Sequence, residues 1–170
     1  MALSIELLLL LLAPMYVANS SALIFGGKTP LDRRLRWSDG RRILGDGKTL
    51  RGTVLGTLWG ILATCVLIAF VPQWVGLFSA NYLGYGILVS VGAIGGDLVG
   101  SFFKRRLGLA RGESAIGLDQ LDFVAGALLL GSLVFFPPLD LLVIMLLVTP
   151  FVHFLANHLA YWLKLKTVPW

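Results

Sequence analysis

The sequence predicts an all-α integral membrane protein with five membrane-spanning helices, and three observations support that fold class. Of the 170 residues, 57% are apolar and only 14% are charged, whereas a soluble domain carries roughly 25% charged residues. The apolar residues gather in runs close to the roughly 20 residues that an α-helix needs to cross a bilayer. All 14 Lys and Arg residues lie in segments that five crossings would place on one side.

The first three runs cover residues 5–25, 53–71 and 84–103. The only charge near the start of the first run is Glu6. A secretory signal peptide begins with positive charge ahead of a short apolar core, so we interpret the first run as a retained span. The third run contains one charged residue, Asp97.

The last two runs cover residues 123–136 and 139–163 and are separated by Pro137 and Pro138. A proline pair does not continue a helix, because proline lacks the backbone N–H and clashes with the preceding turn. We therefore expect two spans here, although the fourth is short for a full crossing and its limits stay open. Residues 1–170 are expected to form a single membrane-embedded domain.

The basic residues predict the orientation, since cytoplasmic loops carry an excess of Lys and Arg. They are Lys28, Arg33, Arg34, Arg36, Arg41, Arg42, Lys48 and Arg51 in the first inner loop, Lys104, Arg105, Arg106 and Arg111 in the second, and Lys164 and Lys166 in the tail. Five spans place all of them in the cytoplasm, with the N-terminus outside. The net charge of +5 then reflects topology rather than nucleic-acid binding.

Two spans carry glycines at helical spacing. The stripes are Gly52, Gly56 and Gly60 in the second span and Gly92, Gly96 and Gly100 in the third. Small residues spaced in this way let helices approach closely in lipid. We therefore favour close helix packing over a direct role in ligand binding.

Eight polar residues in and beside the spans lie toward the cytoplasmic side, whereas the opposite side carries only two charged residues, Glu6 and Asp140. The eight are Asn19, Asp97, His153 and Asn157 within spans, and Lys48, Arg51, Asp119 and Asp122 at span mouths. Ionisable groups inside a membrane are costly and usually functional. A transporter would be expected to carry such groups across both halves of the membrane, so this pattern predicts one polar cleft open to the cytoplasm.

Three carboxylates in this set suggest a divalent cation. Asp119 and Asp122 are three residues apart and share a helix face, and Asp97 could meet them from the neighbouring span. Oxygen ligands beside basic residues suit Mg²⁺ shared with a nucleotide phosphate. Stabilisation of a helix N-terminus by Asp119 and Asp122 is an equally good interpretation of that pair. For His153 and Asn157, which also share a face, a structural hydrogen bond stays an open alternative.

The first inner loop combines glycines, which free the backbone to wrap around phosphate, with Lys and Arg donors. Its richest stretch covers residues 38–52 and includes Asp39, Arg41, Lys48 and Thr49. The spacing does not match a P-loop. Ordinary positive-inside charge or a patch for anionic lipid explains most of its arginines equally well.

Several of these residues together resemble the CDP-diglyceride synthases. The matching elements are Gly96-Asp97, Ser101, Lys104-Arg105-Arg106 and Asp119-Gln120-Leu121-Asp122. Gln120 stands where that family carries an Arg, and the His-Gly-Gly element of the bacterial enzymes is absent. The chain is more similar to the archaeal branch, the CDP-archaeol synthases, through Ala18-Asn19, Phe25-Gly26-Gly27, the loop 39–49, Arg51-Gly52, Pro150, His153 and Asn157.

This resemblance covers nearly the whole chain, and it implies a Mg²⁺-dependent transfer of a cytidylyl group from CTP to a lipid phosphate. The implied acceptor is 2,3-bis-O-geranylgeranylglycerol 1-phosphate, and the products are CDP-archaeol and pyrophosphate. We assign Asp97, Asp119 and Asp122 to the metal and, with Lys104, to catalysis. The expected substrate-binding residues are Asn19, Asp39, Arg41, Lys48, Thr49, Arg51, Ser101, Arg105, His153 and Asn157. Alternatives are a CTP-dependent lipid or polyprenol kinase and, less favoured, a small transporter.

Overall fold

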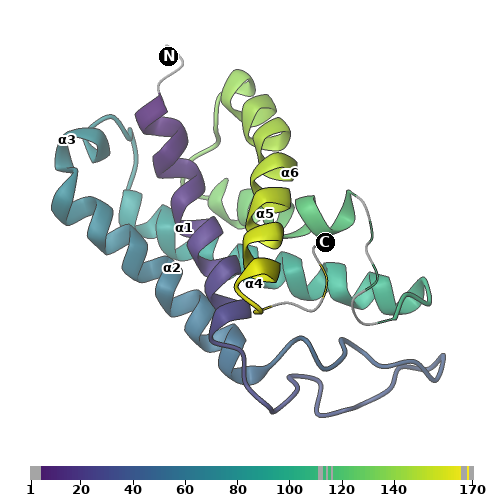
Figure 1. The fold of residues 1–170 in the computed structure, drawn as a ribbon. Coiled ribbons are helices and arrows are strands. Elements are labelled where there is room, and N and C mark those ends of the chain that lie inside the picture. Colours follow the sequence, from purple (N-terminus) through teal and green to yellow (C-terminus); the bar gives the residue numbers. More distant parts are fainter. Residues whose placement is uncertain (1–4, 111–112, 114, 116, 166–167, 169–170) are drawn as a thin grey trace.

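The computed structural model describes residues 5–110, 113, 115, 117–165 and 168, and its regular structure is helical (Figure 1). Two isolated bridges, Pro30 to Thr49 and Arg36 to Arg42, are the exceptions in this part of the chain. The helices are α1 (Ile5–Ile24), α2 (Leu50–Phe70), α3 (Pro72–Val75), α4 (Tyr82–Arg106), α5 (Leu118–Gly131) and α6 (Leu139–Trp162). The expected all-α fold is confirmed. The predictions for Arg111 and Lys166 lie outside the described residues.

Four of these helices, α1, α2, α4 and α6, are long and apolar enough to cross a membrane. α5 has 14 residues, fewer than the roughly 20 that a full crossing needs. It begins and ends five residues earlier than the expected span 123–136. Gly117, with φ of 87°, precedes its first turn, and turns and extended chain fill residues 132–138.

Polar side chains set two helix starts that the apolar runs placed too late. Thr49 caps α2, because its side-chain oxygen accepts a hydrogen bond from the Gly52 N–H at 3.1 Å. Asn81 caps α4 in the same way by accepting from the Gly84 N–H at 2.9 Å. Capping satisfies an N–H that would otherwise lack a partner in the first turn. The short helix α3, which has Pro72 in its first turn, was not predicted.

The glycine stripe of α2 packs against α1, as its spacing predicted. A Cβ atom at Gly56 would lie 2.8 Å from the Ala18 carbonyl oxygen, and one at Gly60 would lie 2.8 Å from that of Pro14. Both distances are too short for real atoms, so only glycine lets the backbones come this close. The two helices lie side by side along most of their length (Figure 1).

The glycine stripe of α4 packs against α5. Cβ atoms at Gly92 and Gly126 would each overlap the carbonyl oxygen of the other residue. Farther along, a Cβ at Gly131 would lie 2.6 Å from Val89. α5 therefore runs antiparallel to α4, from the C-terminal end of α4 back toward its N-terminal half.

An aromatic cluster joins the far ends of these helices. The Phe78 and Phe135 ring centroids are 4.5 Å apart, so the segment after α5 reaches the connection between α3 and α4. Tyr82 at the start of α4 donates to the Leu10 carbonyl oxygen of α1 at 2.9 Å. The chain after α5 therefore lies near the start of α4 and the first half of α1.

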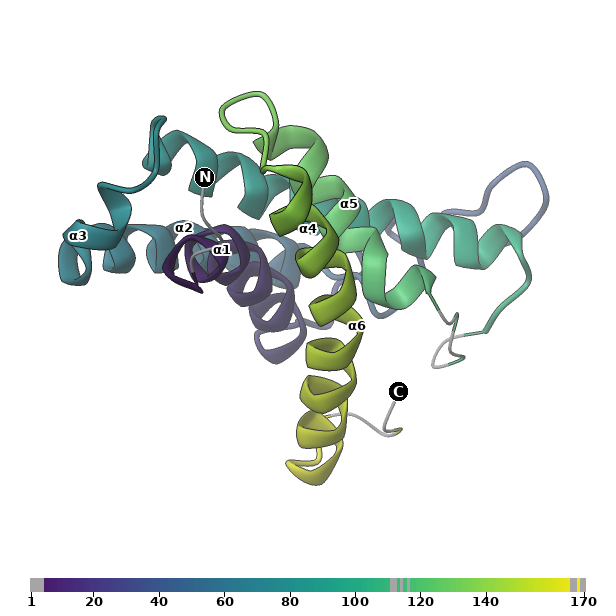
Figure 2. The ribbon, with the colours of Figure 1, turned by 90° about the horizontal axis from the view of Figure 1, so that it is seen from above.

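α6 contacts the other helices through a narrow stripe. Its buried residues are Leu141, Met145, Thr149 and Asn157, which fall on one face of a helix. The Tyr16 and Thr149 hydroxyl groups form a hydrogen bond of 2.9 Å between α1 and α6. Toward its C-terminus α6 extends away from the other helices (Figure 2).

The loop 25–49 has a polar core of its own, centred on Asp32. The Asp32 side chain is 1% exposed and accepts hydrogen bonds from Arg42 at 2.7 Å and from the Leu44 and Gly45 N–H groups at 3.0 Å. Burial alone would raise the pKa of Asp32, but these bonds and one from the Arg34 N–H outweigh it, so its pKa lies well below the ordinary value. The loop is therefore an ordered platform.

Candidate active site

The loop delivers Lys48 to the carboxylate of Asp97. The Lys48 Nζ atom lies 2.7 Å from Oδ1 and 2.6 Å from Oδ2 of Asp97. The Lys48 side chain is 25% exposed and that of Asp97 is 16% exposed. Lys48 occupies this position because Thr49, the next residue, caps α2 and fixes the direction of the chain. The pair joins the loop 25–49 to α4 at a site that solvent still reaches.

A second ion pair forms between the end of α4 and the start of α5. The Lys104 Nζ atom lies 2.5 Å from Oδ1 of Asp119. The other Asp119 oxygen accepts a hydrogen bond from the Ala115 N–H at 2.8 Å. Both carboxylate oxygens of Asp119 are thus engaged at the N-terminus of α5, one with a cation and one with the backbone.

Asp122 lies between these pairs, against Gly100 of α4. Its Oδ1 atom accepts from the Phe123 N–H at 2.6 Å. Its Oδ2 atom is buried and has no hydrogen-bond partner among the described residues. The missing side chain at Gly100 makes room for this carboxylate, because a Cβ there would overlap it. A buried carboxylate oxygen without a donor is costly and is suited to a cation that arrives with a substrate.

The two lysines and three aspartates act on one another as a single charged cluster. Lys48, Asp97 and Lys104 lie close enough to Asp122 for their charges to affect it. With every group ionised, two ammonium groups and three carboxylates leave one net negative charge. No three Asp, Glu, His or Cys side chains in the described part of the chain stand close enough together to hold a metal ion as arranged. In this arrangement Lys48 and Lys104 form ion pairs with two of the three carboxylates, those of Asp97 and Asp119.

Replacing Gly100 by Ala should disrupt this cluster. The added Cβ would lie 2.7 Å from the Cβ of Asp122, so α5 must move or Asp122 must turn. Overpacking of this kind costs about 1–3 kcal/mol, and we expect a lower melting temperature in detergent together with at least a tenfold loss of turnover. Gly95→Ala is the matched control, because nothing lies within 4 Å of a Cβ there. Equal behaviour of the two variants would contradict this account of the α4–α5 contact.

Thr49, Arg41 and Asp39, which were predicted to bind substrate, make contacts that fix the loop. Thr49 caps α2 and also accepts from the Gly27 N–H at 3.0 Å. Arg41 donates to the Arg106 carbonyl oxygen at 2.6 Å, which satisfies the C-terminal end of α4. Asp39 pairs with Arg106 at 3.1 Å. These contacts hold the loop along the end of α4, as Figure 1 shows.

A small cationic cavity opens where the loop meets the end of α4. Its volume is about 260 Å³, and Arg41, Arg42 and Arg105 line it beside Gly108 and Leu109. The Arg105 Nε atom is buried without a hydrogen-bond partner among the described residues. An arginine fork is shaped to bind phosphate oxygens. One Nη atom of Arg105 already donates to the Leu109 carbonyl oxygen at 2.5 Å, so its Nε is the group available to an anion, and Arg42 is engaged by Asp32 and Asp46.

Four further predicted residues lie on three helices, α1, α4 and α6. Ser101 is buried on α4, one residue beyond Gly100. His153 and Asn157 form a hydrogen bond of 3.0 Å on α6, and the His153 ring stacks on Phe123, the residue after Asp122. Asn19 is half-buried near the C-terminal end of α1. The structure thus brings α6 to the edge of the cluster through Phe123.

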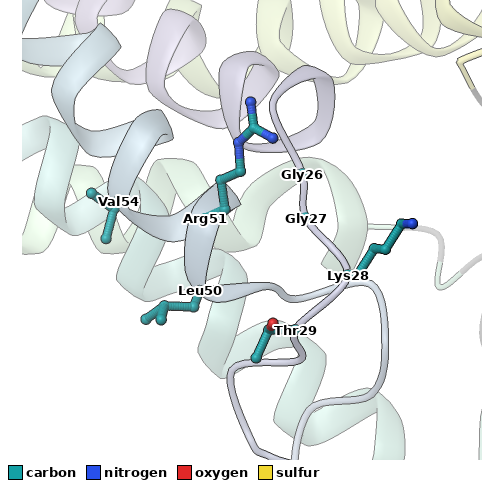
Figure 3. Close-up of a pocket in the computed structure, with 7 residues that line it drawn as sticks. All are labelled: Gly26, Gly27, Lys28, Thr29, Leu50, Arg51 and Val54. Carbon is teal, nitrogen blue, oxygen red and sulfur yellow. The ribbon is translucent and has the colours of Figure 1, made fainter.

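Arg51 alone is placed elsewhere. It belongs to the first turn of α2 and lines an open groove with the Gly26–Gly27 segment (Figure 3). Gly60, nine residues on, contacts Ser90 of α4, and nine residues correspond to about 180° around a helix. Arg51 therefore points away from α4 and from Asp97.

Sequence reasoning missed the residues that organise the loop. Asp32, Arg42 and Arg106 have no assigned function in the motifs, yet Asp32 holds the loop together and Arg106 donates to the Arg42 carbonyl oxygen. The one signal in the sequence was that Asp32 directly precedes Arg33 and Arg34. Such a pattern suggests a local ion pair, but it does not show that the carboxylate is buried.

Comparisons with known proteins agree with this site. The model of the CarS-like CDP-archaeol synthase family matches residues 2–170. Proteins named CDP-archaeol synthase from Methanocaldococcus jannaschii and Methanopyrus kandleri are each 48% identical to this chain. The alignments cover 92% of this chain in both cases, and 92% and 88% of the relatives. One from Pyrococcus abyssi is 44% identical over 92% of this chain and 93% of its own.

A solved structure supports the same assignment. It is described as an intramembrane enzyme for archaeal membrane lipid biosynthesis and superposes with a TM-score of 0.78 at 34% identity, covering 88% of this chain and 91% of its own. Both the sequence and the fold therefore match over nearly their whole length. The chain belongs to the CDP-archaeol synthase family, a family of membrane-embedded cytidylyltransferases.

Proposed function

We propose that this chain transfers the cytidylyl group of CTP to the phosphate of an archaeal ether lipid, giving CDP-archaeol and pyrophosphate. The observation that carries the proposal is the cluster of Lys48, Asp97, Lys104, Asp119 and Asp122, which combines ammonium groups and carboxylates at one end of the bundle. Family membership supports this reaction over a CTP-dependent kinase or a transporter.

In the proposed reaction, an oxygen of the lipid phosphate attacks the α-phosphorus of CTP. A P–O bond forms there as the bond to the bridging oxygen of the β-phosphate breaks, and pyrophosphate leaves with that electron pair. No strong general base is needed, because a phosphate dianion is already nucleophilic. The main barrier is the approach of two anions, and such reactions are catalysed mostly by positioning and electrostatics.

The lysines are proposed to exchange partners when CTP binds. Lys48 and Lys104 pair with Asp97 and Asp119 in the structure, and phosphate oxygens of CTP offer them stronger acceptors. Arg105 would supply a further donor from the cationic cavity. Exchange leaves the carboxylates without their cations, which makes them available to a divalent ion.

The donor chemistry of the cluster suits Mg²⁺, and the three carboxylates would have to come closer together than in the structure to share one ion. Three carboxylates supply the hard oxygen ligands that this ion prefers, and Oδ2 of Asp122 is buried without a donor among the described residues. Asp97, Asp119 and Asp122 would hold the ion. When bound, it would neutralise charge on the CTP phosphates and on the leaving pyrophosphate.

We propose the unsaturated ether lipid, 2,3-bis-O-geranylgeranylglycerol 1-phosphate, as the acceptor. The assay that tests the function uses purified protein with labelled CTP, Mg²⁺ and this lipid. Labelled CDP-lipid with one pyrophosphate per turnover is expected, whereas CDP with a newly phosphorylated lipid would indicate a kinase. The saturated lipid phosphate, run in parallel, tests the finer claim about the chains.

We further propose five membrane crossings, with α5 and residues 132–136 together forming the fourth. The antiparallel contact with α4 and the Phe78–Phe135 pair support a chain that travels as far as α4 does. The N-terminus would then lie outside and the C-terminus in the cytoplasm.

Cysteine labelling in vesicles tests this topology. The native thiol is first removed by Cys65→Ala, and single cysteines are then introduced by Ser38→Cys, Phe136→Cys and Leu163→Cys. A membrane-impermeant reagent is expected to reach positions 38 and 163 from the cytoplasmic side and position 136 from the opposite side. Labelling of positions 38 and 163 from opposite faces would rule out five crossings.

A further inference from the structure

The groove at the start of α2 lies outside the cluster that the reaction uses. Its volume is about 700 Å³, within the range of pockets that hold small molecules. Gly26 and Gly27 form one wall, and the first turn of α2 forms the other. A Cβ at Gly27 would lie 3.0 Å from the Cβ of Arg51, so glycine lets the Arg51 stem lie directly against the backbone.

Two cations border this groove without partners. Neither Lys28 nor Arg51 forms an ion pair or a side-chain hydrogen bond with any residue that the structure describes. Figure 3 shows Arg51 extending along the Gly26–Gly27 segment, whereas Lys28 follows that segment and extends away from Arg51 on its other side. The groove therefore presents the positive charge of Arg51 next to backbone that carries no side chain, with Lys28 at its edge.

Apolar surface continues from the groove along the outer face of α2. Val54, Leu58 and Leu62 are 49%, 53% and 46% exposed, and residues four apart lie one above another on a helix. Trp59, stacked on Phe25 at 5.3 Å, borders the strip. A ligand in the groove thus meets cations at the membrane surface and a lipid-facing strip beyond them.

We propose that this groove binds the phosphodiester headgroup of an inner-leaflet lipid at Arg51, with Lys28 at the edge of the site and one chain of that lipid along Val54, Leu58 and Leu62. Charge complementarity selects an anionic headgroup, and the apolar strip selects a ligand with a hydrocarbon chain over a free nucleotide. Because Arg51 points away from Asp97, this lipid is a bound component of the membrane rather than the acceptor of the reaction.

Native mass spectrometry of the purified protein, released from nanodiscs that contain phosphatidylglycerol, tests the proposal. The wild type should retain one phosphatidylglycerol that survives delipidation. Arg51→Gln and Lys28→Gln should each lower its affinity about fivefold, since a basic residue at the membrane surface contributes about 1 kcal/mol. Arg33→Gln is the matched control, because Arg33 is an exposed loop cation outside the groove. Equal retention by Arg51→Gln and Arg33→Gln would overturn the proposal.

The KM values of Arg51→Gln for CTP and for the acceptor lipid show whether the groove binds a membrane lipid or a substrate of the reaction. If the groove holds a membrane lipid, Arg51→Gln loses phosphatidylglycerol while its KM for the acceptor lipid and for CTP stays within about twofold of the wild type. A rise in either KM that matches the loss of lipid binding would instead assign Arg51 to a substrate and overturn the inference. Lipid retention is measured without turnover, so it stands even if the reaction assay fails.

Discussion

Asp97→Asn should abolish cytidylyl transfer while leaving the protein folded. The substitution keeps the size of the side chain but removes its charge, so the variant loses both the partner of Lys48 and a proposed metal ligand. Removal of one preorganised electrostatic group typically lowers kcat by about 10²–10³-fold, and loss of a metal ligand should place turnover at or beyond the upper end. Insertion should not suffer, because a neutral side chain enters a membrane more easily than a carboxylate.

Asp140→Asn provides the control for this prediction. Asp140 is an exposed carboxylate at the start of α6, so the same chemical change is made outside the cluster and turnover should stay near the wild-type value. Size-exclusion elution and labelling at position 38 check that both variants fold and insert. Near-normal turnover in Asp97→Asn would remove the centre of the proposed metal site.

Lys48→Ala should lower kcat/KM for CTP by about 10- to 150-fold. Hydrogen bonds to charged groups contribute about 1.5–3 kcal/mol, which corresponds to that range of rates. Arg34→Ala removes the same formal charge from the loop and should cost little, since the Arg34 side chain is exposed and its recorded contact to Asp32 uses the backbone N–H. A similar modest loss in both variants would mean that the loop acts through diffuse charge.

The structure adds a second test of Lys48, because the lysine also neutralises Asp97. If that were its whole function, Lys48→Ala would strengthen binding of a divalent cation at Asp97 and leave CTP affinity unchanged. If Lys48 moves to the CTP phosphates, CTP affinity falls in a titration without turnover. Calorimetry with Mg²⁺ alone and then with CTP separates the two outcomes.

The fold class and the helix contacts were accessible from sequence because they follow from composition and spacing. Apolar runs predicted the four long helices, and the glycine stripes predicted which faces meet. The start of α2 was misplaced because Arg51 and Gly52 read as loop, whereas the hydroxyl group of Thr49 begins the helix before them. The start of α5 was placed five residues too late because Asp119, Gln120 and Asp122 are polar, and hydropathy alone excludes such residues from a span.

The sequence predicted which residues contribute to the site better than it predicted which of them lie together. Lys48 and Arg51 are three residues apart and looked equivalent, but Lys48 precedes the helix while Arg51 belongs to its first turn, so the two side chains diverge. Asp32 was invisible because its burial depends on how an irregular loop folds. Whether the three aspartates converge on a metal is a question that sequence spacing raised and that the proposed mutants address.

The self-contained polar core of the loop bears on the order in which the protein is made. Every partner of Asp32 lies between residues 34 and 45, and the α1–α2 contact needs only the first 70 residues. This hairpin can therefore mature while the rest of the chain is still on the ribosome. Lys48 would then already stand at the membrane surface when α4 enters, and its ammonium group would ease the burial of Asp97.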